Sequence, residues 1–233
     1  MTSLNSLPPS VCGEYCNHTP LDLFDSSQCE KLATQAATGR NFTVLLNTAT
    51  EKAVQVCLKE DNYLAWLPIA QLSTLKPVSE PYNPLIFNRN DILPRLGEVI
   101  AFTKAAMEQP NYYLWGGTIG PNYDCSGLIQ RAFAISGIWL PRDSYQQEAF
   151  TQKIEKEDLL AGDLIFFGQR QVNHVALYLG KGYYIHSSGH ETGRNSIAID
   201  PFSGQGDVIS QVYYNNFWSC GRVMRSYNNS LTA

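Results

Sequence analysis

The sequence has no excess of basic residues and no long apolar run. Its 233 residues include 17 Lys and Arg against 21 Asp and Glu, which gives a formal net charge of −4 and a pI near 5.6. Because phosphate contacts require a basic surface, this balance argues against a nucleic-acid binder. No segment approaches the ~20 apolar residues of a membrane-spanning helix, so no membrane partner is predicted. With 44% apolar and 16% charged residues, we expect a packed core and little disorder.

The first twenty residues lack the features of a secretory signal. They contain no Lys or Arg and no continuous apolar segment. We therefore expect a cytoplasmic location. In that reducing compartment the six cysteines are expected to be free thiols, mostly buried, rather than disulfide-bonded.

Recognisable cofactor and metal motifs are missing as well. The sequence has no Gly-rich phosphate loop. Cys12, Cys16 and His18 lie close enough together to resemble half of a zinc site, but a second ligand pair at metal-site spacing is missing. We therefore predict neither a cofactor nor a metal ion.

The first third of the chain has the pattern of a small β-rich domain. Apolar runs of about five residues at 42–46, 54–58 and 63–67 alternate with turn-prone segments, which favours a sandwich or small barrel over residues 1–77. The run at 63–67 ends in Pro68 and is predicted to be the final strand. Residues 78–95 are punctuated by prolines and polar side chains and are predicted to form a linker.

Residues 96–233 are predicted to form a second domain of the α+β class. Helical periodicity predicts helices over 96–107 and 126–136, the second ending at Gly137. Strand-like runs follow at 163–167, 174–179, 183–186 and 208–214. Because the helices come first and the strands later, we expect an antiparallel sheet rather than a doubly wound one.

Cys125 is the candidate nucleophile. It lies between Asp124 and Ser126, directly before the second predicted helix, where backbone N–H groups and the helix dipole favour negative charge. This position predicts a thiol pKa below its usual value of ~8.5 and hence a reactive thiolate. The alternative is a buried, inert cysteine that caps the helix, which is the usual state of a lone free cysteine.

Two of the four histidines favour the catalytic interpretation. His174 opens one predicted strand and His186 lies in the next, with a Gly-Lys-Gly turn at 180–182 between them. A hairpin centred on residue 180 would pair positions 174 and 186, so that one histidine takes the thiol proton and the other fixes its tautomer. Either histidine alone could also be a satisfied core residue. His190 is predicted to be a loop residue.

Five sequence blocks resemble the NlpC family of papain-like cysteine peptidases, which act on bacterial peptidoglycan peptides. The blocks are 113–117, 124–128, 162–167, 173–180 and 185–186, all in order within residues 96–227. The resemblance implies a papain-like domain with Cys125 as nucleophile, His174 as general base and acid, and His186 as the orienting polar residue. It also implies that the hydroxyl of Tyr113 joins the backbone N–H of Cys125 in an oxyanion hole.

Residues 10–77 are similar to the bacterial SH3-like domains that accompany these peptidases. In some relatives this domain closes one end of the groove, and the enzyme releases L-Ala-γ-D-Glu from an L-diamino acid only when the N-terminal L-Ala is free. The resemblance then implies that Tyr63 and Asp124 bind the α-amine and that Ser126 and Ser144 lie near the dipeptide. An acidic residue of the first domain, either Asp22 or Asp25, is implied to assist.

Two other functions are open from the sequence. A Cys–His pair also serves papain-like amidases and acyltransferases, because the acceptor and not the acyl-enzyme decides the product. A non-catalytic protein could instead join an SH3-like wall-binding domain to an inactive one. The presence of Cys125, His174 and His186 together favours a peptidase, with small murein peptides as its substrate.

Overall fold

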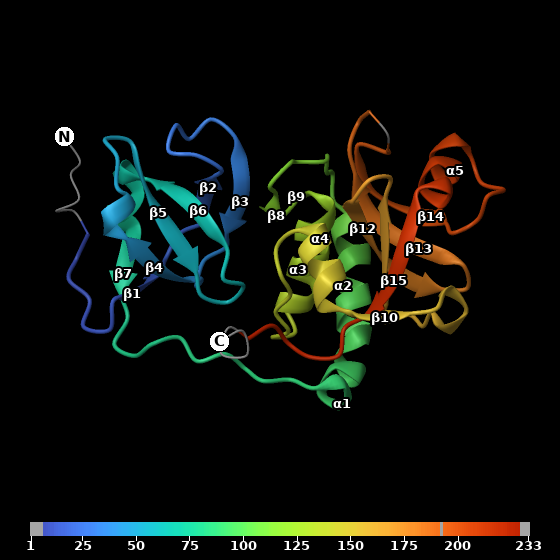
Figure 1. Cartoon of the computed structure of the whole chain (residues 1–233), viewed down its shortest axis with the longest axis horizontal. Helices are drawn as coiled ribbons and strands as arrows, with labels where there is room; N and C mark the ends of the chain where they lie inside the picture. The colour runs from blue at the N-terminus through green and yellow to red at the C-terminus, as the bar shows by residue number, and fades with distance from the viewer. Residues whose placement is uncertain (1–6, 192, 229–233) are drawn as a thin grey trace. The chain divides into compact units, whose positions relative to one another are not determined.

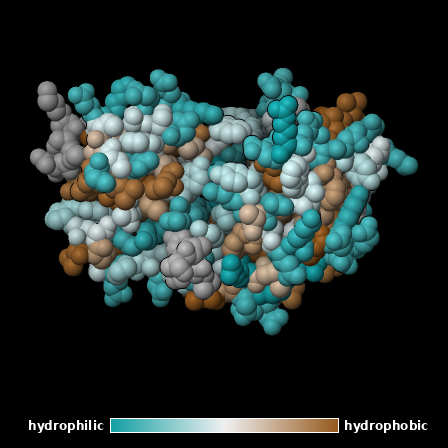
Figure 2. Space-filling view, viewed as in Figure 1, coloured by the Kyte–Doolittle hydropathy of each residue, from teal (hydrophilic) through white to brown (hydrophobic). Residues whose placement is uncertain are grey.

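The computed structural model describes residues 7–191 and 193–228, and the chain forms two compact units (Figure 1). Among the described residues, the first unit contains 7–84, 115–119 and Asn228, and the second contains 85–114, 120–191 and 193–227. In the described ranges, no helix is long and apolar enough to cross a membrane. Hydrophilic side chains cover much of the face shown in Figure 2, with apolar patches between them.

The first unit is built on one antiparallel sheet of seven strands. Its order is β3-β2-β6-β5-β4-β1-β7. The strands are β1 (Glu14–Asn17), β2 (Leu21–Phe24), β3 (Leu32–Ala36), β4 (Asn41–Leu45), β5 (Ala53–Leu58), β6 (Leu64–Pro68) and β7 (Leu75–Pro77). Alternate residues of β5, namely Val54, Val56 and Leu58, are fully buried, as the two-residue period of a strand requires. The apolar runs predicted as strands are therefore confirmed as β4, β5 and β6.

The prediction that the run at 63–67 is the final strand of this unit is wrong. A 3₁₀ turn over Ile69–Thr74 follows β6, and the chain then forms β7, which pairs with β1. Leu72 and Leu75 are fully buried in the core of the unit. A three-residue strand carries too short an apolar pattern to be recognised in the sequence.

A segment from the middle of the chain, Trp115–Ile119, completes the first unit. Its short strand β8 (Thr118–Ile119) is held by Gln35, whose Oε1 accepts the backbone N–H of Thr118 at 3.1 Å. The Thr118 hydroxyl donates to the Gln35 carbonyl at 2.7 Å. Gly116 has a φ of +79°, and a Cβ there would lie 2.8 Å from the Leu32 side chain, so only glycine fits.

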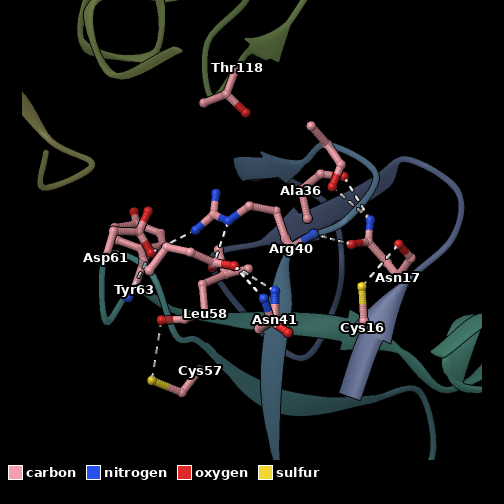
Figure 3. A network of polar contacts seen from close by, with 12 residues as sticks. Cys16, Asn17, Ala36, Arg40, Asn41, Cys57, Leu58, Asp61, Tyr63 and Thr118 are labelled. Atoms are coloured by element: carbon pink, nitrogen blue, oxygen red, sulfur yellow. Dashed lines mark hydrogen bonds and ion pairs between the residues drawn. The ribbon is translucent and has the colours of Figure 1, made fainter. Parts of the chain in front are cut away.

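A buried ionic network ties together the strands of the first unit (Figure 3). Arg40 donates through Nε to Glu60 at 2.8 Å and through Nη2 to Asp61 at 2.9 Å. Burial alone would lower the pKa of Arg40, but the charges of Asp61 and Glu60 raise it, so the guanidinium stays ionised. Glu60 also accepts the backbone N–H of Asn41 at 2.7 Å. One buried cation thus neutralises two carboxylates in the turn between β5 and β6.

The second unit combines five helices with a six-stranded antiparallel sheet, which confirms the predicted α+β class. The sheet order is β10-β15-β11-β12-β13-β14. Its strands are β10 (Gln152–Ile154), β11 (Leu164–Gly168), β12 (Val172–Gly180), β13 (Tyr183–Ser188), β14 (Ser196–Pro201) and β15 (Phe217–Arg222), and β9 (Asn122–Tyr123) lies apart from them. The helices are α1 (Arg89–Ile92), α2 (Leu96–Glu108), α3 (Cys125–Ala134), α4 (Ser144–Phe150) and α5 (Val208–Asn215).

Alternate residues of β11 face two different clusters of the core. Leu164 and Phe166 pack with residues of α2 and α3, whereas Ile165 and Phe167 pack in an aromatic cluster that includes Tyr213 of α5. The strand is therefore covered on both faces. This explains why its five residues are all buried and why it appears in the sequence as a continuous apolar run.

The helices predicted at 96–107 and 126–136 are confirmed as α2 and α3, and the strands at 163–167, 174–179 and 183–186 as β11, β12 and β13. The predicted strand at 208–214 is wrong, because that segment is helix α5. Asp207 caps it by accepting the Ser210 backbone N–H at 3.0 Å, and the buried Ser210 and Tyr213 lie three residues apart on one helix face. Within the predicted linker, residues 89–92 form α1, which begins with a capping box at Asn88.

Candidate active site

Cys125 is the first residue of α3, and its side chain is buried with 5% exposure. Asp124 caps the helix, because its Oδ1 accepts the Gly127 backbone N–H at 2.6 Å. Backbone N–H groups of Val175 and Ser126 interact with the thiol. Val175 directly follows His174 in β12. The thiol of Cys125 therefore lies against strand β12, next to the predicted base His174.

The prediction of a lowered thiol pKa is wrong. Burial, and after it the negative charge of Asp124, raises the pKa of Cys125 to about 12. The N–H groups of Val175 and Ser126 and the Arg142 charge act in the opposite direction but are weaker. Position at a helix N-terminus is visible in a sequence, whereas the extent of burial is not. In the substrate-free protein the thiol is thus neutral at physiological pH.

His174 and His186 lie on adjacent strands and are bonded ring to ring. His174 Nε2 and His186 Nδ1 are 2.8 Å apart, and both side chains are buried. The predicted direct pairing of positions 174 and 186 is wrong, because Leu177 pairs with Ile185 and an irregularity follows at residues 178–180. This register places the two histidines diagonally rather than opposite each other, which still allows long side chains to meet.

The histidine pair is neutral at physiological pH. Burial, and then the neighbouring His186, lowers the pKa of His174 well below its usual value. Burial also lowers the pKa of His186, although a hydrogen bond to Asp200 opposes this effect. A neutral His174 can accept a proton. Because its Nε2 is engaged with His186, Nδ1 is the ring nitrogen that remains for the thiol.

Two neighbours of this pair were not identified from the sequence. Tyr213 of α5 packs its ring on His174, with centroids 4.7 Å apart, and on His186, with centroids 4.8 Å apart. Asp200 of β14 lies 2.9 Å from Nε2 of His186 through Oδ2. Neither residue belongs to a recognisable motif. Tyr213 lies in the segment that was predicted as a strand, and Asp200 lies in a strand that was not predicted.

Tyr113 lies close enough to Cys125 for the thiol to influence its pKa. Burial, and after it the neighbouring Cys125 and Asp124, raise the pKa of Tyr113, so its hydroxyl stays protonated and can donate. Its backbone N–H donates to the Asn195 carbonyl at 3.3 Å, which fixes the chain at this point. Its role in an oxyanion hole stays a prediction.

The predicted substrate residues of the second unit form part of a buried polar cluster. Arg142, which is 1% exposed, donates to Asp124 at 2.6 Å and to the Ser126 hydroxyl at 2.9 Å. Ser144 is buried at the start of α4, two residues beyond Arg142. Arg142 was not predicted as a site residue, although it lies directly before the Asp143-Ser144 pair in the sequence. The substrate contacts of these residues stay predictions.

The predicted substrate residues of the first unit have local partners. Tyr63 is half-buried, and its backbone N–H donates to Asp61 Oδ1 at 3.3 Å. Asp22 is exposed and accepts from Gln35 Nε2 at 2.8 Å, while Asp25 lies exposed after β2. Their roles in amine binding stay predictions. His190 is exposed in a turn, as predicted.

The neutral thiol leads to a testable pH dependence. We expect the rate of Cys125 alkylation by iodoacetamide to rise about tenfold per pH unit between about pH 6 and 9, because the thiolate fraction grows in this way below a raised pKa. The Cys125→Ala variant supplies the background from the other five cysteines. A rate that is flat across this range would mean a preformed thiolate and would contradict the assignment of the resting state.

A cysteine that begins a helix, beside two adjacent strands that carry a histidine pair, is the arrangement expected of a papain-like cysteine peptidase. Residues 110–219 match the NlpC/P60 family, and residues 23–72 match the bacterial dipeptidyl-peptidase Sh3 domain. The chain therefore carries an NlpC/P60 domain preceded by a bacterial SH3 domain. The family resemblance and the fold class predicted from the sequence are both confirmed.

Two similar proteins are named gamma-D-glutamyl-L-lysine dipeptidyl-peptidase. The one from Bacillus cereus is 39% identical over 126 residues, which cover 52% of this chain and 36% of that protein. The one from Bacillus subtilis is 40% identical over 79 residues, covering 32% of this chain and 27% of that protein. The matches thus span only about a third of these relatives. A crystal structure of an NlpC/P60 family protein from Bacillus cereus is 24% identical, covers 91% of this chain and 64% of that chain, and has a TM-score of 0.48.

Proposed function

We propose that the protein is a cysteine peptidase that hydrolyses the bond between γ-D-Glu and an L-diamino acid in murein peptides with a free N-terminal L-Ala. The products are L-Ala-γ-D-Glu and the diamino acid with whatever follows it. The observation that carries the proposal is the bonded pair of His174 and His186 next to the buried thiol of Cys125. The names of the relatives from Bacillus cereus and Bacillus subtilis support the substrate class.

Acylation begins from a neutral thiol and a neutral imidazole. His174 takes the thiol proton as the sulfur of Cys125 forms a bond to the γ-carbonyl carbon of D-Glu. The oxyanion is stabilised by the Cys125 backbone N–H and the Tyr113 hydroxyl. The carbon–nitrogen bond then breaks, and the imidazolium gives its proton to the departing amine of the diamino acid.

Deacylation uses the same groups in reverse. Water attacks the thioester carbonyl while His174 takes one of its protons, and the carbon–sulfur bond breaks. The thiolate recovers a proton from the imidazolium, and L-Ala-γ-D-Glu leaves as the free acid. His186 stabilises the imidazolium that forms in both steps by bonding to its Nε2.

The polar cluster next to the nucleophile suits the dipeptide that is released. L-Ala-γ-D-Glu carries an ammonium group and an α-carboxylate, and both need polar partners when they are removed from water. Asp124, Ser126 and Ser144 are buried at the start of α3 and α4, and Arg142 adds a positive charge. We assign Asp124 to the ammonium group and the two serines to the remaining polar groups of the dipeptide.

A cytoplasmic location is part of the proposal. The six cysteines are free thiols, which is the state that a reducing compartment maintains. An enzyme in that compartment meets free wall peptides rather than intact peptidoglycan. This would make the protein a peptidase of cell-wall peptide recycling.

The test is mass-spectrometric product analysis with L-Ala-γ-D-Glu-L-Lys, its meso-diaminopimelate counterpart and their N-acetylated forms. We expect cleavage of the free peptides between D-Glu and the diamino acid, and a loss of more than about 100-fold on acetylation, because an acetylated amine carries no charge for Asp124 to bind. Equal cleavage of both forms would overturn the requirement for a free amine. Cleavage of neither, with transfer to an added amine instead, would favour an acyltransferase.

A further inference from the structure

His186 uses both of its ring nitrogens in buried hydrogen bonds. Nδ1 lies 2.8 Å from Nε2 of His174, and Nε2 lies 2.9 Å from Oδ2 of Asp200. His186 and Asp200 are at most 1% exposed. The register pairs His186 with Ala198, so Asp200 is its diagonal neighbour on β14. Three side chains from three consecutive strands thus form one continuous polar chain that ends on a carboxylate.

Asp200 is itself held by partners on both oxygens. Arg194 Nη2 donates to Oδ1 and Arg194 Nε donates to Oδ2 at 3.4 Å. The Ser210 hydroxyl lies 3.3 Å from Oδ1 of Asp200 and 2.8 Å from Oδ1 of Asp207. The same guanidinium donates through Nη1 to Asp207, the cap of α5, at 2.7 Å. Burial alone would raise the pKa of Asp200, but the bonds from His186 and Arg194 lower it to about 2. The carboxylate is therefore ionised and can only accept hydrogen bonds.

We propose that Asp200 is a positioning residue of the peptidase, which acts through His186 to set the tautomer of His174. An ionised Asp200 requires a proton on Nε2 of His186, so Nδ1 of neutral His186 must accept. His174 then carries its proton on Nε2, and its Nδ1 keeps the lone pair that takes the thiol proton. The inference rests on the proposed function for its catalytic consequence, but the tautomer itself does not depend on any substrate.

The groups that surround the polar chain of His174, His186 and Asp200 do not change which ring nitrogens carry protons. Tyr184 of β13 and Tyr213 of α5 pack edge-on against His186. Burial, and then the charge of Asp200, raises the pKa of Tyr184, so its hydroxyl stays neutral. Hydrogen bonds to Asp200 and Asp207 raise the pKa of Arg194, which therefore remains a cation. Asp200 is the ionised acceptor that lies within hydrogen-bond distance of the histidine pair.

Asp200→Asn is the sharpest test because the closer Arg194 donor favours one orientation of the amide. Arg194 Nη2 donates closely to Oδ1, whereas Arg194 Nε lies 3.4 Å from Oδ2, so we expect the amide oxygen at Oδ1 and the amide nitrogen in place of Oδ2. A donor then faces Nε2 of His186, which must lose its proton and carry it on Nδ1 instead. His174 Nε2 becomes the acceptor, and its proton moves to Nδ1, where it blocks proton transfer from the thiol.

A second buried aspartate provides the matched control. Asp163 is fully buried, bonds Arg222 at 2.8 and 2.9 Å and accepts the Leu160 backbone N–H at 2.7 Å. It has no bond to either histidine. Asp163→Asn therefore reproduces the loss of a buried Asp–Arg pair without changing the tautomer of His174.

The readouts are nitrogen-15 NMR of the histidine rings and steady-state kinetics on L-Ala-γ-D-Glu-L-Lys. With four histidines in the chain, His18 and His190 variants allow the ring signals to be assigned. We expect His174 to be protonated on Nε2 in the unaltered protein and in Asp163→Asn, and on Nδ1 in Asp200→Asn. We expect Asp200→Asn to lower kcat by about 100-fold or more with KM within about threefold, and Asp163→Asn to change kcat by less than about threefold.

The NMR result separates this inference from the proposed function. If the unaltered protein cleaves no murein peptide, the proposed function fails while the ring signals still test Asp200. An unchanged His174 tautomer in Asp200→Asn would overturn the inference, whether or not kcat falls, because a loss without a tautomer change is a structural effect. A changed tautomer with kcat within about threefold of the unaltered enzyme would overturn the catalytic consequence.

Discussion

Cys125→Ala is expected to abolish turnover of L-Ala-γ-D-Glu-L-Lys while the protein remains folded. The substitution removes the atom that we propose forms the acyl-enzyme, and removal of such a nucleophile typically lowers kcat by about 10⁵-fold or more. The side chain is small and buried at a helix start, so the backbone of α3 and its Asp124 cap should persist. The measurement is the initial rate of L-Lys release, with circular dichroism to verify the fold.

Cys220→Ala is the matched control for that experiment. Cys220 is also buried, at 2% exposure, but it lies in β15 and packs with Ile165 and Phe167 in a different cluster from Cys125. The same atoms are removed from a buried site with no catalytic role, so kcat should stay within about threefold. Comparable losses in the two variants would mean that the effect of Cys125→Ala is structural.

Arg40→Ala is expected to destabilise the first unit by about 3–5 kcal/mol. The variant leaves Glu60 and Asp61 buried at 4% and 6% exposure without the cation that neutralises them. Hydrogen–deuterium exchange of peptides from β4 to β6 measures the effect directly. Each loss of about 1.4 kcal/mol in stability makes the opening equilibrium of a strand about tenfold more favourable. Amide exchange in these strands should therefore accelerate at least about 100-fold.

The contrast with a more exposed ion pair makes the Arg40 prediction specific. Lys59 and Glu14 are 3.0 Å apart, and the lysine side chain is 29% exposed. Lys59→Ala should cost no more than about 1 kcal/mol, because water screens this pair. If the two variants accelerated exchange equally, burial would not be what makes the Arg40 network important.

The parts of this protein that could be predicted from sequence are those in which the residue type itself limits the chemistry. Cys125, His174 and His186 stand out because a thiol before a helix and two histidines in strand patterns are rare combinations. Strands such as β5 and helices such as α2 carry clear two-residue or helical periods. These signals are local in the sequence, so they can be recognised without knowledge of the fold.

What could not be predicted depends on contacts between distant segments. Asp200 is one aspartate among many until β14 places it beside His186. The thiol pKa changes direction because burial of Cys125 outweighs the helix N-terminus, and burial is a property of the whole fold. The segment of helix α5 favours a strand by residue type, because it is rich in β-branched and aromatic residues, but its apolar residues at 208, 209, 212 and 213 have the spacing of a helix face.

The central claim is that Cys125 carries the acyl group of L-Ala-γ-D-Glu during turnover. Rapid acid quenching of the enzyme during cleavage of L-Ala-γ-D-Glu-L-Lys, followed by mass spectrometry of intact protein and of its peptides, tests it most directly. We predict a mass increase equal to L-Ala-γ-D-Glu less one water, located on the peptide that contains Cys125 and absent from Cys125→Ala. Turnover without any adduct, or an adduct on another residue, would contradict the account.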